Sequence, residues 1–479
     1  MSLEVDILSF TRKLIGNSFV RGMMKRLVDA DPEGYRSRLD HVLAMLAGES
    51  SIHDASIECL IEYRLFSSLI KLALRYMRIS SEEFEAGIKD PSIRRGIELV
   101  FRSLIIYGVT VPQKLCSPFL IVWNFTNACN LKCKHCYQNA SKPLPTELTL
   151  QEKLNILSQL DEAGVPLIAL SGGEPTIHPD FLKIVEEGSR RGIYMAVATN
   201  GLTFSSMDFT VKALRAGLKY VEVSLDSVNP EIHDEIRGVK GAWEKTVNGV
   251  KNLVKMNASV GLAMTITKLN YREAEDMVKL GEELGVKRVI FFNFIPTGRG
   301  RDIVKLDLTP VEREEFLRKV YELARKSSIQ VASTAPQLAR VSWQMSSGVD
   351  CLPTHFTPPQ SQSLRALAEF IGGCGAGRIY AAIQPDGKVT PCVFLPIIVG
   401  DLRKSTFREI WSSDPVLRKL RNKELLKPPC GGCQYKYVCG GCRARAYGYF
   451  NDFLAPDPGC LRGEIVKSSQ TLLPIQKIS

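Results

Sequence analysis

The first 110 residues read as a succession of amphipathic helices. Apolar residues recur at three- and four-residue steps between Ile57 and Tyr76, which places them on one face of a helix. Asp90-Pro91 interrupts the pattern before another apolar helix, expected around residues 97–106. No stretch here alternates between apolar and polar residues as a strand would. The pattern predicts an all-helical N-terminal domain, to which we assign residues 1–112.

From about residue 118 to 325, short apolar runs alternate with stretches of helical period. Six runs are expected to form strands: Phe119–Trp123, Leu167–Leu170, Met195–Ala198, Val221–Leu225, Leu262–Ile266 and Val289–Phe294. Capping chemistry marks three helix starts: Thr149 with Glu152, Asn270 with Glu273, and Thr309 with Glu312. Alternating strands and helices predict a parallel sheet with helical crossovers. Six strands are too few for a closed eight-stranded barrel, so we expect an α/β fold with a partial (β/α)6 TIM-type barrel over residues 113–335.

The third zone, about residues 370–465, is rich in glycine and cysteine and shows little periodicity. Such a pattern is typical of a small fold organised by metal rather than by an apolar core. We assign residues 336–479 to this Cys-rich C-terminal domain.

Composition narrows the class of protein. Of the 479 residues, 45% are apolar and 24% charged, as in ordinary globular proteins. Apolar runs fall far short of the roughly 18 residues of a membrane span, and no signal peptide opens the chain, so we expect a cytoplasmic protein. Thirteen cysteines in that compartment indicate metal binding rather than disulfides. The net charge of +11 favours an acidic or anionic partner, but no basic stripe interleaved with aromatic residues indicates nucleic-acid binding.

Three cysteines follow the first expected strand in the spacing C-x3-C-x2-C: Cys129, Cys133 and Cys136. This places them at the carboxyl edge of the sheet, where α/β folds have their active sites. A structural zinc site takes four ligands, so three leave one coordination position open. A zinc knuckle and incidental thiols are the alternatives that the spacing alone leaves open.

Two further motifs follow later strands. The segment Ser171–Pro175 contains Gly172, Gly173 and Glu174, where paired glycines let a ligand approach the backbone and a carboxylate can bind a charged amino group. Ser224 and Asp226 follow the fourth strand, and a carboxylate there suits ribose hydroxyl groups.

With these motifs, residues 118–465 resemble the radical S-adenosylmethionine (SAM) enzymes. The resemblance implies a 4Fe-4S cluster on the three cysteines, with its fourth iron open for the amino and carboxylate groups of SAM. Reductive cleavage of SAM then yields a 5′-deoxyadenosyl radical that abstracts hydrogen from a substrate. It also implies the SAM contacts: the methionine amino group on Gly172, Gly173 and Glu174, the ribose near Ser224 and Asp226, the adenine near His135, and the methionine carboxylate on Arg237. For Arg237, a solvated charge at a helix end is the alternative.

The C-terminal cysteines resemble the SPASM extension of this family, which carries one or two auxiliary 4Fe-4S clusters. The array comprises seven residues: Cys374, Cys392, Cys430, Cys433, Cys439, Cys442 and Cys460. The resemblance implies one cluster on Cys430, Cys433, Cys439 and Cys460, and a second on Cys374, Cys392 and Cys442, with Cys351 or no further cysteine as its fourth ligand. The two-residue spacing between Cys439 and Cys442 departs from the commoner three, and a zinc ribbon is the alternative.

The substrate is less well defined. The segment from Cys439 to Cys460 resembles the tail of radical enzymes that build tetrapyrroles, while the cysteine layout is similar to that of peptide maturases. The resemblance implies a low-potential electron donor of the ferredoxin or flavodoxin type. Two alternatives stay open: an iron-sulfur electron-transfer or scaffold protein, and action on a membrane lipid through the basic, apolar segment Leu8–Val28.

Overall fold

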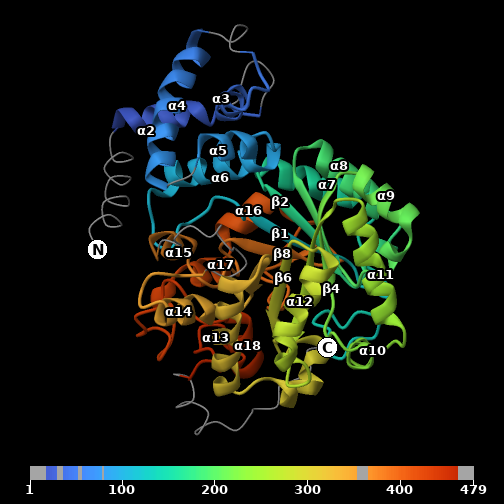
Figure 1. The fold of residues 1–479 in the computed structure, drawn as a ribbon. Helices are drawn as coiled ribbons and strands as arrows, with labels where there is room; N and C mark the ends of the chain where they lie inside the picture. The colour runs from blue at the N-terminus through green and yellow to red at the C-terminus, as the bar shows by residue number, and fades with distance from the viewer. Residues whose placement is uncertain (1–17, 30–35, 52–56, 78–79, 353–364, 462–479) are drawn as a thin grey trace.

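The computed structural model describes residues 18–29, 36–51, 57–77, 80–352 and 365–461 (Figure 1). The N-terminal part is helical, as predicted, with α2 (Ser18–Leu27), α3 (Arg38–Leu46), α4 (Ile57–Met77), α5 (Ser81–Ile88) and α6 (Pro91–Tyr107). Asp90 caps α6, because its Oδ1 accepts a hydrogen bond from the backbone N of Ser92 at 2.9 Å. Leu39, Leu43 and Phe66 belong to a small separate core.

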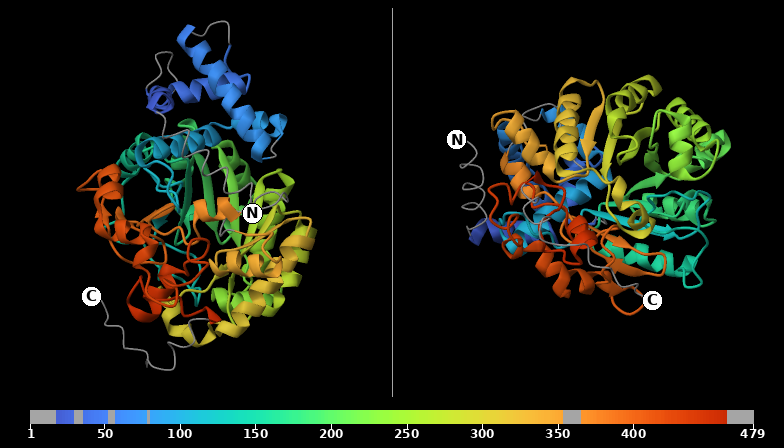
Figure 2. Two further views of the ribbon diagram at one scale, coloured as in Figure 1. Left: turned by 90° about the vertical axis from the view of Figure 1, so that its left-hand side faces the viewer. Right: turned by 90° about the horizontal axis from the view of Figure 1, so that it is seen from below.

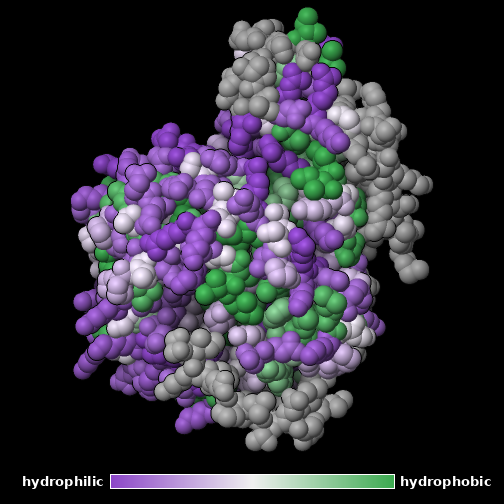
Figure 3. Space-filling view, turned by 180° about the vertical axis from the view of Figure 1, so that it is seen from behind, coloured by the Kyte–Doolittle hydropathy of each residue, from purple (hydrophilic) through white to green (hydrophobic). Residues whose placement is uncertain are grey.

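The proposed membrane-binding segment lies partly outside the described residues, which begin at Ser18. Its described part, α2, buries Met24 and Leu27 and packs against α3 and α6. No described helix is long and apolar enough to cross a membrane. Exposed apolar side chains do occur on α4, at Ile57 and Ile61, and Figure 3 shows hydrophobic residues exposed in this upper layer of the molecule.

One ten-stranded sheet forms the body of the molecule, in the order β10-β9-β8-β1-β2-β3-β4-β5-β6-β7. The six predicted strands are confirmed as β1 (Leu120–Thr126), β2 (Leu167–Gly172), β3 (Tyr194–Thr199), β4 (Leu218–Ser224), β5 (Ser259–Ile266) and β6 (Arg288–Asn293), all parallel. The mixed α/β class is therefore confirmed. The strand count of six was too low, because the short β7 (Gln330–Ser333) also pairs parallel with β6.

The C-terminal part contributes three strands to the same sheet. β8 (Tyr380–Ile383) pairs parallel with β1, with Tyr380 opposite Leu120. β9 (Lys388–Thr390) and β10 (Gly400–Asp401) continue antiparallel to the edge. The sheet is open, since β10 and β7 are its two edge strands.

Helices flank the sheet (Figure 2). They are α7 (Leu150–Glu162), α8 (Phe181–Arg190), α9 (Met207–Arg215), α10 (Pro230–Arg237), α11 (Ala242–Lys255), α12 (Ala274–Leu284), α13 (Pro310–Lys326), α14 (Gln337–Met345), α15 (Arg365–Ile371), α16 (Phe407–Ser413), α17 (Pro415–Arg421) and α18 (Arg443–Phe450). Short 3-10 turns occur at η1 (Pro175–Ile177), η2 (Thr203–Ser205), η3 (Tyr271–Glu273), η4 (Gly298–Leu306) and η5 (Lys423–Leu425).

Two of the three predicted caps are present, as capping boxes at Thr149 and Thr309. The third prediction was wrong. The Asn270 side chain accepts a hydrogen bond from the backbone N of Thr267 at 2.8 Å, and Glu273 binds the Ser227 hydroxyl at 2.6 Å instead of capping its own helix.

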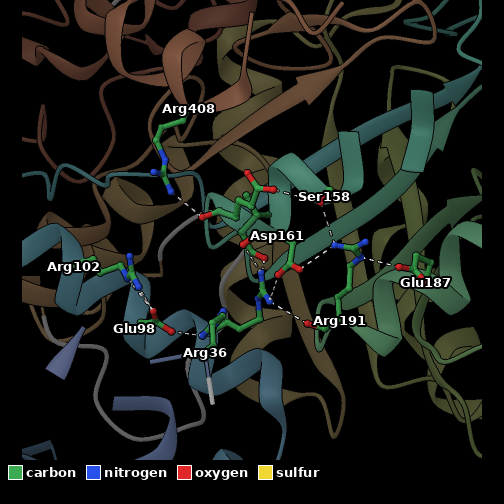
Figure 4. Close-up of polar contacts among 11 residues, drawn as sticks. Arg36, Glu98, Arg102, Ser158, Asp161, Glu187, Arg191 and Arg408 are labelled. Carbon is green, nitrogen blue, oxygen red and sulfur yellow. Dashed lines mark hydrogen bonds and ion pairs between the residues drawn. The ribbon is translucent and has the colours of Figure 1, made fainter. Parts of the chain in front are cut away.

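The helical layer meets the sheet body through arginine–carboxylate contacts (Figure 4). Arg95 pairs with Asp161 at 2.7 Å and donates to the backbone oxygens of Val165 and Arg191, which precede β2 and β3. Arg191 also binds Asp161 at 3.2 Å. Because these contacts lie at the amino ends of the strands, the carboxyl ends stay free for a site.

Strand residues alternate between two environments, as a period of two requires. On β4, Val221 and Val223 are fully buried in the main core, which includes Val250 of α11. Tyr220, Glu222 and Ser224 face the other way and line a cavity. The interior of the curved sheet is therefore a chamber rather than a packed core.

Candidate active site and metal centres

The three cysteines that follow β1 lie in one loop, residues 127–141, whose two ends are held together. Glu147 accepts a hydrogen bond from the backbone N of Asn127 at 2.7 Å, and the backbone N of Cys129 donates to the oxygen of Ser141 at 3.1 Å. These contacts fix the loop at the carboxyl end of β1, as the sequence predicted for Cys129, Cys133 and Cys136.

Backbone N–H groups point at the sulfur atoms of this loop. The N–H of Leu131 donates to Cys129 Sγ at 3.5 Å, and that of Ala140 donates to Cys136 Sγ at 3.4 Å. Such donors stabilise a thiolate more than a thiol. Burial raises the pKa of Cys129 to about 12, so a bound cation is what would hold it as a thiolate at neutral pH. The loop therefore fits a metal cluster.

The Gly-Gly-Glu segment packs directly against the cysteine loop. The backbone N of Gly173 donates to the oxygen of Thr126 at 2.7 Å, and that of Glu174 donates to Ala128 at 2.8 Å. A Cβ on Gly173 would lie 2.0 Å from the Ala128 oxygen, and Gly172 has a φ of +116° that favours glycine. The glycines thus allow the close approach of the cysteine loop, and both also line the cavity, where the approach of a ligand stays a prediction.

The Glu174 carboxylate organises the next loop of the site. Its Oε1 accepts hydrogen bonds from Thr176, through both backbone N and hydroxyl, and from the Thr199 hydroxyl, while its Oε2 accepts one from the backbone N of Asn200 at 2.7 Å. Burial raises the pKa of Glu174. A carboxylate has about four acceptor positions, and these four hydrogen bonds occupy them, so Glu174 joins the segment after β2 to the loop after β3.

Asp226, His135, Arg237 and Cys133 form a connected chain. The Asp226 carboxylate is buried, with Oδ2 2.7 Å from Arg237 Nε and 3.5 Å from His135 Nε2. Burial alone would raise the pKa of Asp226, but Arg237 and His135 hold it below its usual value. Arg237 Nη1 donates to Cys133 Sγ at 3.7 Å. The Asp226 carboxylate is engaged in this chain, whereas Ser224, His135 and Arg237 line the cavity, and the ribose contact of Asp226 stays a prediction.

The cavity inside the sheet has a volume of about 820 Å³. Its wall includes both three-cysteine sets of the chain: Cys129, Cys133, Cys136, Cys374, Cys392 and Cys442. Such a volume lies within the range of about 300–1,000 Å³ that is usual for small-molecule sites. Both sets therefore border the same space.

Tyr137 and Arg299 are among the cavity-wall residues that were not found from the sequence. The Tyr137 hydroxyl donates to Asn124 Oδ1 at 2.9 Å and lies 2.9 Å from the Ser171 hydroxyl. Arg299 donates to the backbone oxygens of Cys133 and Ala140, each at 2.8 Å, and so clamps the cysteine loop. The only signal for Tyr137 was its place beside the third cysteine, and nothing local marked Arg299.

Four further cysteines form a second group. Cys430, Cys433, Cys439 and Cys460 line a separate small pocket of about 30 Å³. Cys351 lies elsewhere: it is fully buried in an apolar cluster, where its thiol donates to the backbone oxygen of Ala339 at 3.6 Å. The structure therefore does not place it in the cavity wall with the second three-cysteine set.

Three buried cations lie near the C-terminal cysteines without carboxylate partners among the described residues: Arg378, Lys423 and Arg443. Their hydrogen bonds go to backbone oxygens, and one guanidinium nitrogen of each arginine is buried without an acceptor. Burial, followed by repulsion from Arg378, lowers the pKa of Lys423 to about 7. Buried cations need anionic partners, and thiolate-bound iron-sulfur clusters supply that charge. The donor sets and their charges therefore fit such clusters.

Comparisons with known proteins agree with this reading. The protein-family model of the Radical SAM superfamily matches residues 123–281, and that of the SPASM iron-sulfur cluster-binding domain matches residues 374–434. The chain is similar to the AdoMet-dependent heme synthase of Methanosarcina barkeri, with 36% identity over 72% of this chain and 97% of the relative. It is also similar to the Fe-coproporphyrin III synthase of the same organism, with 30% identity over 71% and 87%, and to mycofactocin maturase MftC of Mycobacterium tuberculosis, with 29% over 72% and 84%.

Solved structures share the fold. SuiB of Streptococcus suis bound to S-adenosylmethionine aligns over 89% of this chain and 93% of its own, with a TM-score of 0.62 and 16% identity. SuiB bound to the precursor peptide SuiA aligns over 84% and 88%, with a TM-score of 0.60 and 16% identity. The two domains that match imply 4Fe-4S clusters, and the relatives are enzymes. The chain belongs to the radical SAM superfamily and carries the SPASM iron-sulfur cluster-binding domain.

Proposed function

We propose that this radical SAM enzyme abstracts hydrogen from a tetrapyrrole. The observation that carries the proposal is the single cavity of about 820 Å³, whose wall contains both the Cys129–Cys136 loop and the Cys374, Cys392 and Cys442 set. A large, flat substrate in it would lie beside the site of radical formation and beside a second cluster that can exchange electrons with it. The similarity to a heme synthase and a coproporphyrin synthase supports a tetrapyrrole.

Residue roles follow from the contacts. We propose that Cys129, Cys133 and Cys136 hold the 4Fe-4S cluster at which SAM supplies a 5′-deoxyadenosyl radical. The methionine amino group then binds at the backbone edge of Gly172 and Gly173, beside the Glu174 carboxylate, since all three residues line the cavity. These residues orient SAM while the Arg299 clamp keeps the cysteine loop in place.

We propose the other SAM contacts from the positions of these residues. Ser224 lines the cavity and keeps its proposed place near the ribose. Asp226 acts indirectly, because its carboxylate positions the Arg237 guanidinium, which donates a hydrogen bond to Cys133 Sγ. Burial lowers the pKa of His135 to about 4, so it is neutral near pH 7 and can offer an apolar, aromatic surface to the adenine.

The C-terminal cysteines would hold two auxiliary clusters. We propose Cys430, Cys433, Cys439 and Cys460 for one, on the basis of their shared pocket. Cys374, Cys392 and Cys442 would hold the other, at the wall of the substrate cavity. A ferredoxin or flavodoxin would supply electrons, and the net charge of +11 favours such an acidic donor. We place the enzyme in the cytoplasm, where its thiols stay reduced.

A peptide is the second candidate substrate, favoured by the similarity to mycofactocin maturase. One assay separates the candidates. The protein is reconstituted anaerobically with iron and sulfide, reduced with dithionite and given SAM, and 5′-deoxyadenosine is quantified with Fe-coproporphyrin III, with heme, or with a peptide panel. We expect stimulation by a porphyrin and none in the Cys133→Ala variant. Stimulation by peptides alone would contradict the tetrapyrrole, and activity in Cys133→Ala would contradict the cluster assignment.

A further inference from the structure

The second auxiliary set has three cysteines, but a 4Fe-4S cluster has four iron corners. Cys374, Cys392 and Cys442 pack in one apolar cluster, and the thiols of Cys374 and Cys442 share a hydrogen bond. Cys351, the candidate from the sequence, is buried in a different cluster with Ala339. A fourth ligand therefore has to come from another residue, from the substrate or from solvent.

Tyr380 is one residue with an oxygen donor that the fold brings to these cysteines. Its hydroxyl lies 3.8 Å from Cys392 Sγ. It packs in the same apolar cluster and lines the same cavity as all three. The Tyr380 hydroxyl is therefore an oxygen donor beside one of the three sulfurs, within the apolar cluster that also holds the other two cysteines.

The backbone is arranged to hold the Tyr380 ring in this place. The segment from Cys374 forms a tight turn in which the backbone N–H groups of Ile379 and Tyr380 donate to the oxygen of Gly375 at 2.9 and 3.2 Å. A Cβ on Gly375 would lie 2.7 Å from the tyrosine ring, so the glycine leaves room for it. Pairing of β8 with β1 then fixes the turn against the sheet.

We propose that Tyr380 is the fourth ligand of the auxiliary cluster on Cys374, Cys392 and Cys442. The inference rests on the proposed presence of that cluster. During assembly an Fe–O bond forms, the phenol O–H bond breaks and the proton passes to solvent, without a change in oxidation state. The uncompensated cations Arg378, Lys423 and Arg443 lie nearby and offset the added negative charge.

The consequence is a cluster closed to substrate. An open iron at the cavity wall would bind a carboxylate of the substrate directly, whereas a tyrosine-ligated cluster can only exchange electrons with it. The oxygen ligand also makes this cluster distinct from the four-cysteine cluster expected on Cys430, Cys433, Cys439 and Cys460. Spectroscopy can therefore separate the two.

The test uses the full chain with Cys129, Cys133 and Cys136 changed to alanine, so that only auxiliary clusters contribute. We expect about eight irons per chain. Protein labelled with ring-deuterated tyrosine should show a deuterium hyperfine coupling from one tyrosine on a reduced cluster. Tyr380→Phe should lose that coupling, and Tyr380→Cys should give a four-thiolate spectrum. Tyr447→Phe, which alters a tyrosine packed on the same apolar cluster, should keep the wild-type spectrum.

The outcomes distinguish two failures. About eight irons without a tyrosine coupling, and an unchanged spectrum in Tyr380→Phe, would overturn the ligand assignment alone. About four irons, unaffected by a further Cys374→Ala change, would show that this cluster is absent, which overturns the auxiliary cluster of the proposed function and the tyrosine ligand with it. A coupling that survives in Tyr380→Phe would also overturn the assignment.

Discussion

Replacing Gly173 by alanine should remove the SAM-binding cluster while leaving the auxiliary clusters in place. The new Cβ would lie 2.0 Å from the Ala128 oxygen, and Cβ contacts under 3.0 Å essentially never occur, so the cysteine loop has to retreat by about 1 Å. That movement stretches the 2.7 and 2.8 Å hydrogen bonds that join Gly173 to Thr126 and Glu174 to Ala128 beyond bonding distance.

The expected cost combines two effects. Overpacking of this kind costs about 1–3 kcal/mol, and each of the two lost hydrogen bonds costs about 0.5–1.5 kcal/mol. The site should therefore lose about 2–6 kcal/mol, most of it local to the cysteine loop. Anaerobic urea unfolding measures the global part, and iron analysis with electron paramagnetic resonance measures the local part.

We expect Gly173→Ala to lose about four irons per chain and to retain about eight, with no 5′-deoxyadenosine formed. Gly87→Ala is the matched control. Gly87 lies on helix α5, and its new Cβ would meet only Ile93, at 3.7 Å. Alanine should therefore be neutral or slightly stabilising at this helical position. Full iron loading in Gly173→Ala would refute the steric reasoning. Loss of every cluster would show instead that the substitution unfolds the chain.

Three further predictions concern buried charges. Asp226→Asn leaves Arg237 buried without a counter-charge and should lower the free energy of urea unfolding by about 3–5 kcal/mol. The control, Asp208→Asn at an exposed ion pair, should change it by less than about 1 kcal/mol. Equal effects of the two substitutions would contradict the role of the buried pair. Lys423→Met removes a buried cation beside the auxiliary sites and should lower the midpoint potential of an auxiliary cluster, so an unchanged redox titration would argue against a cluster there. Burial raises the pKa of Glu222 to about 7, above the unfolded value of 4.5. The folded state therefore binds the proton more tightly, and the stability of the wild type falls as the pH rises from 4.5 to about 7. Glu222→Gln should therefore gain unfolding free energy relative to the wild type between pH 5 and pH 8, and a difference independent of pH would contradict the buried carboxyl.

The local pattern of apolar and polar residues was sufficient to predict most strands of the sheet. Apolar runs located β1 to β6, because each strand is bounded by turn residues and buried on its helix-covered face. β7 was missed because its four residues, Gln330–Ser333, offer too little pattern. The pairing of β8 with β1 was also missed, since it joins segments about 260 residues apart and depends on tertiary packing.

The site was predicted in outline but not in its contacts. Spacing and position after strands located the cysteines and the Gly-Gly-Glu segment, which the structure brings to one cavity. The engagement of Asp226 with Arg237 could not be read locally, because α10 sets it by turning Arg237 back toward the loop. Tyr380 carried no signal either, since only the turn after Cys374 places its hydroxyl beside the cysteines.

Hydrogen abstraction from a tetrapyrrole is tested most directly by isotope transfer. Reconstituted enzyme is reduced with dithionite and incubated with SAM and Fe-coproporphyrin III deuterated on its propionate side chains, and the 5′-deoxyadenosine is analysed by mass spectrometry. The proposed function predicts 5′-deoxyadenosine that carries one deuterium from the substrate, and none of it in the Cys133→Ala variant. Unlabelled 5′-deoxyadenosine, formed at the same rate with and without the porphyrin, would contradict it.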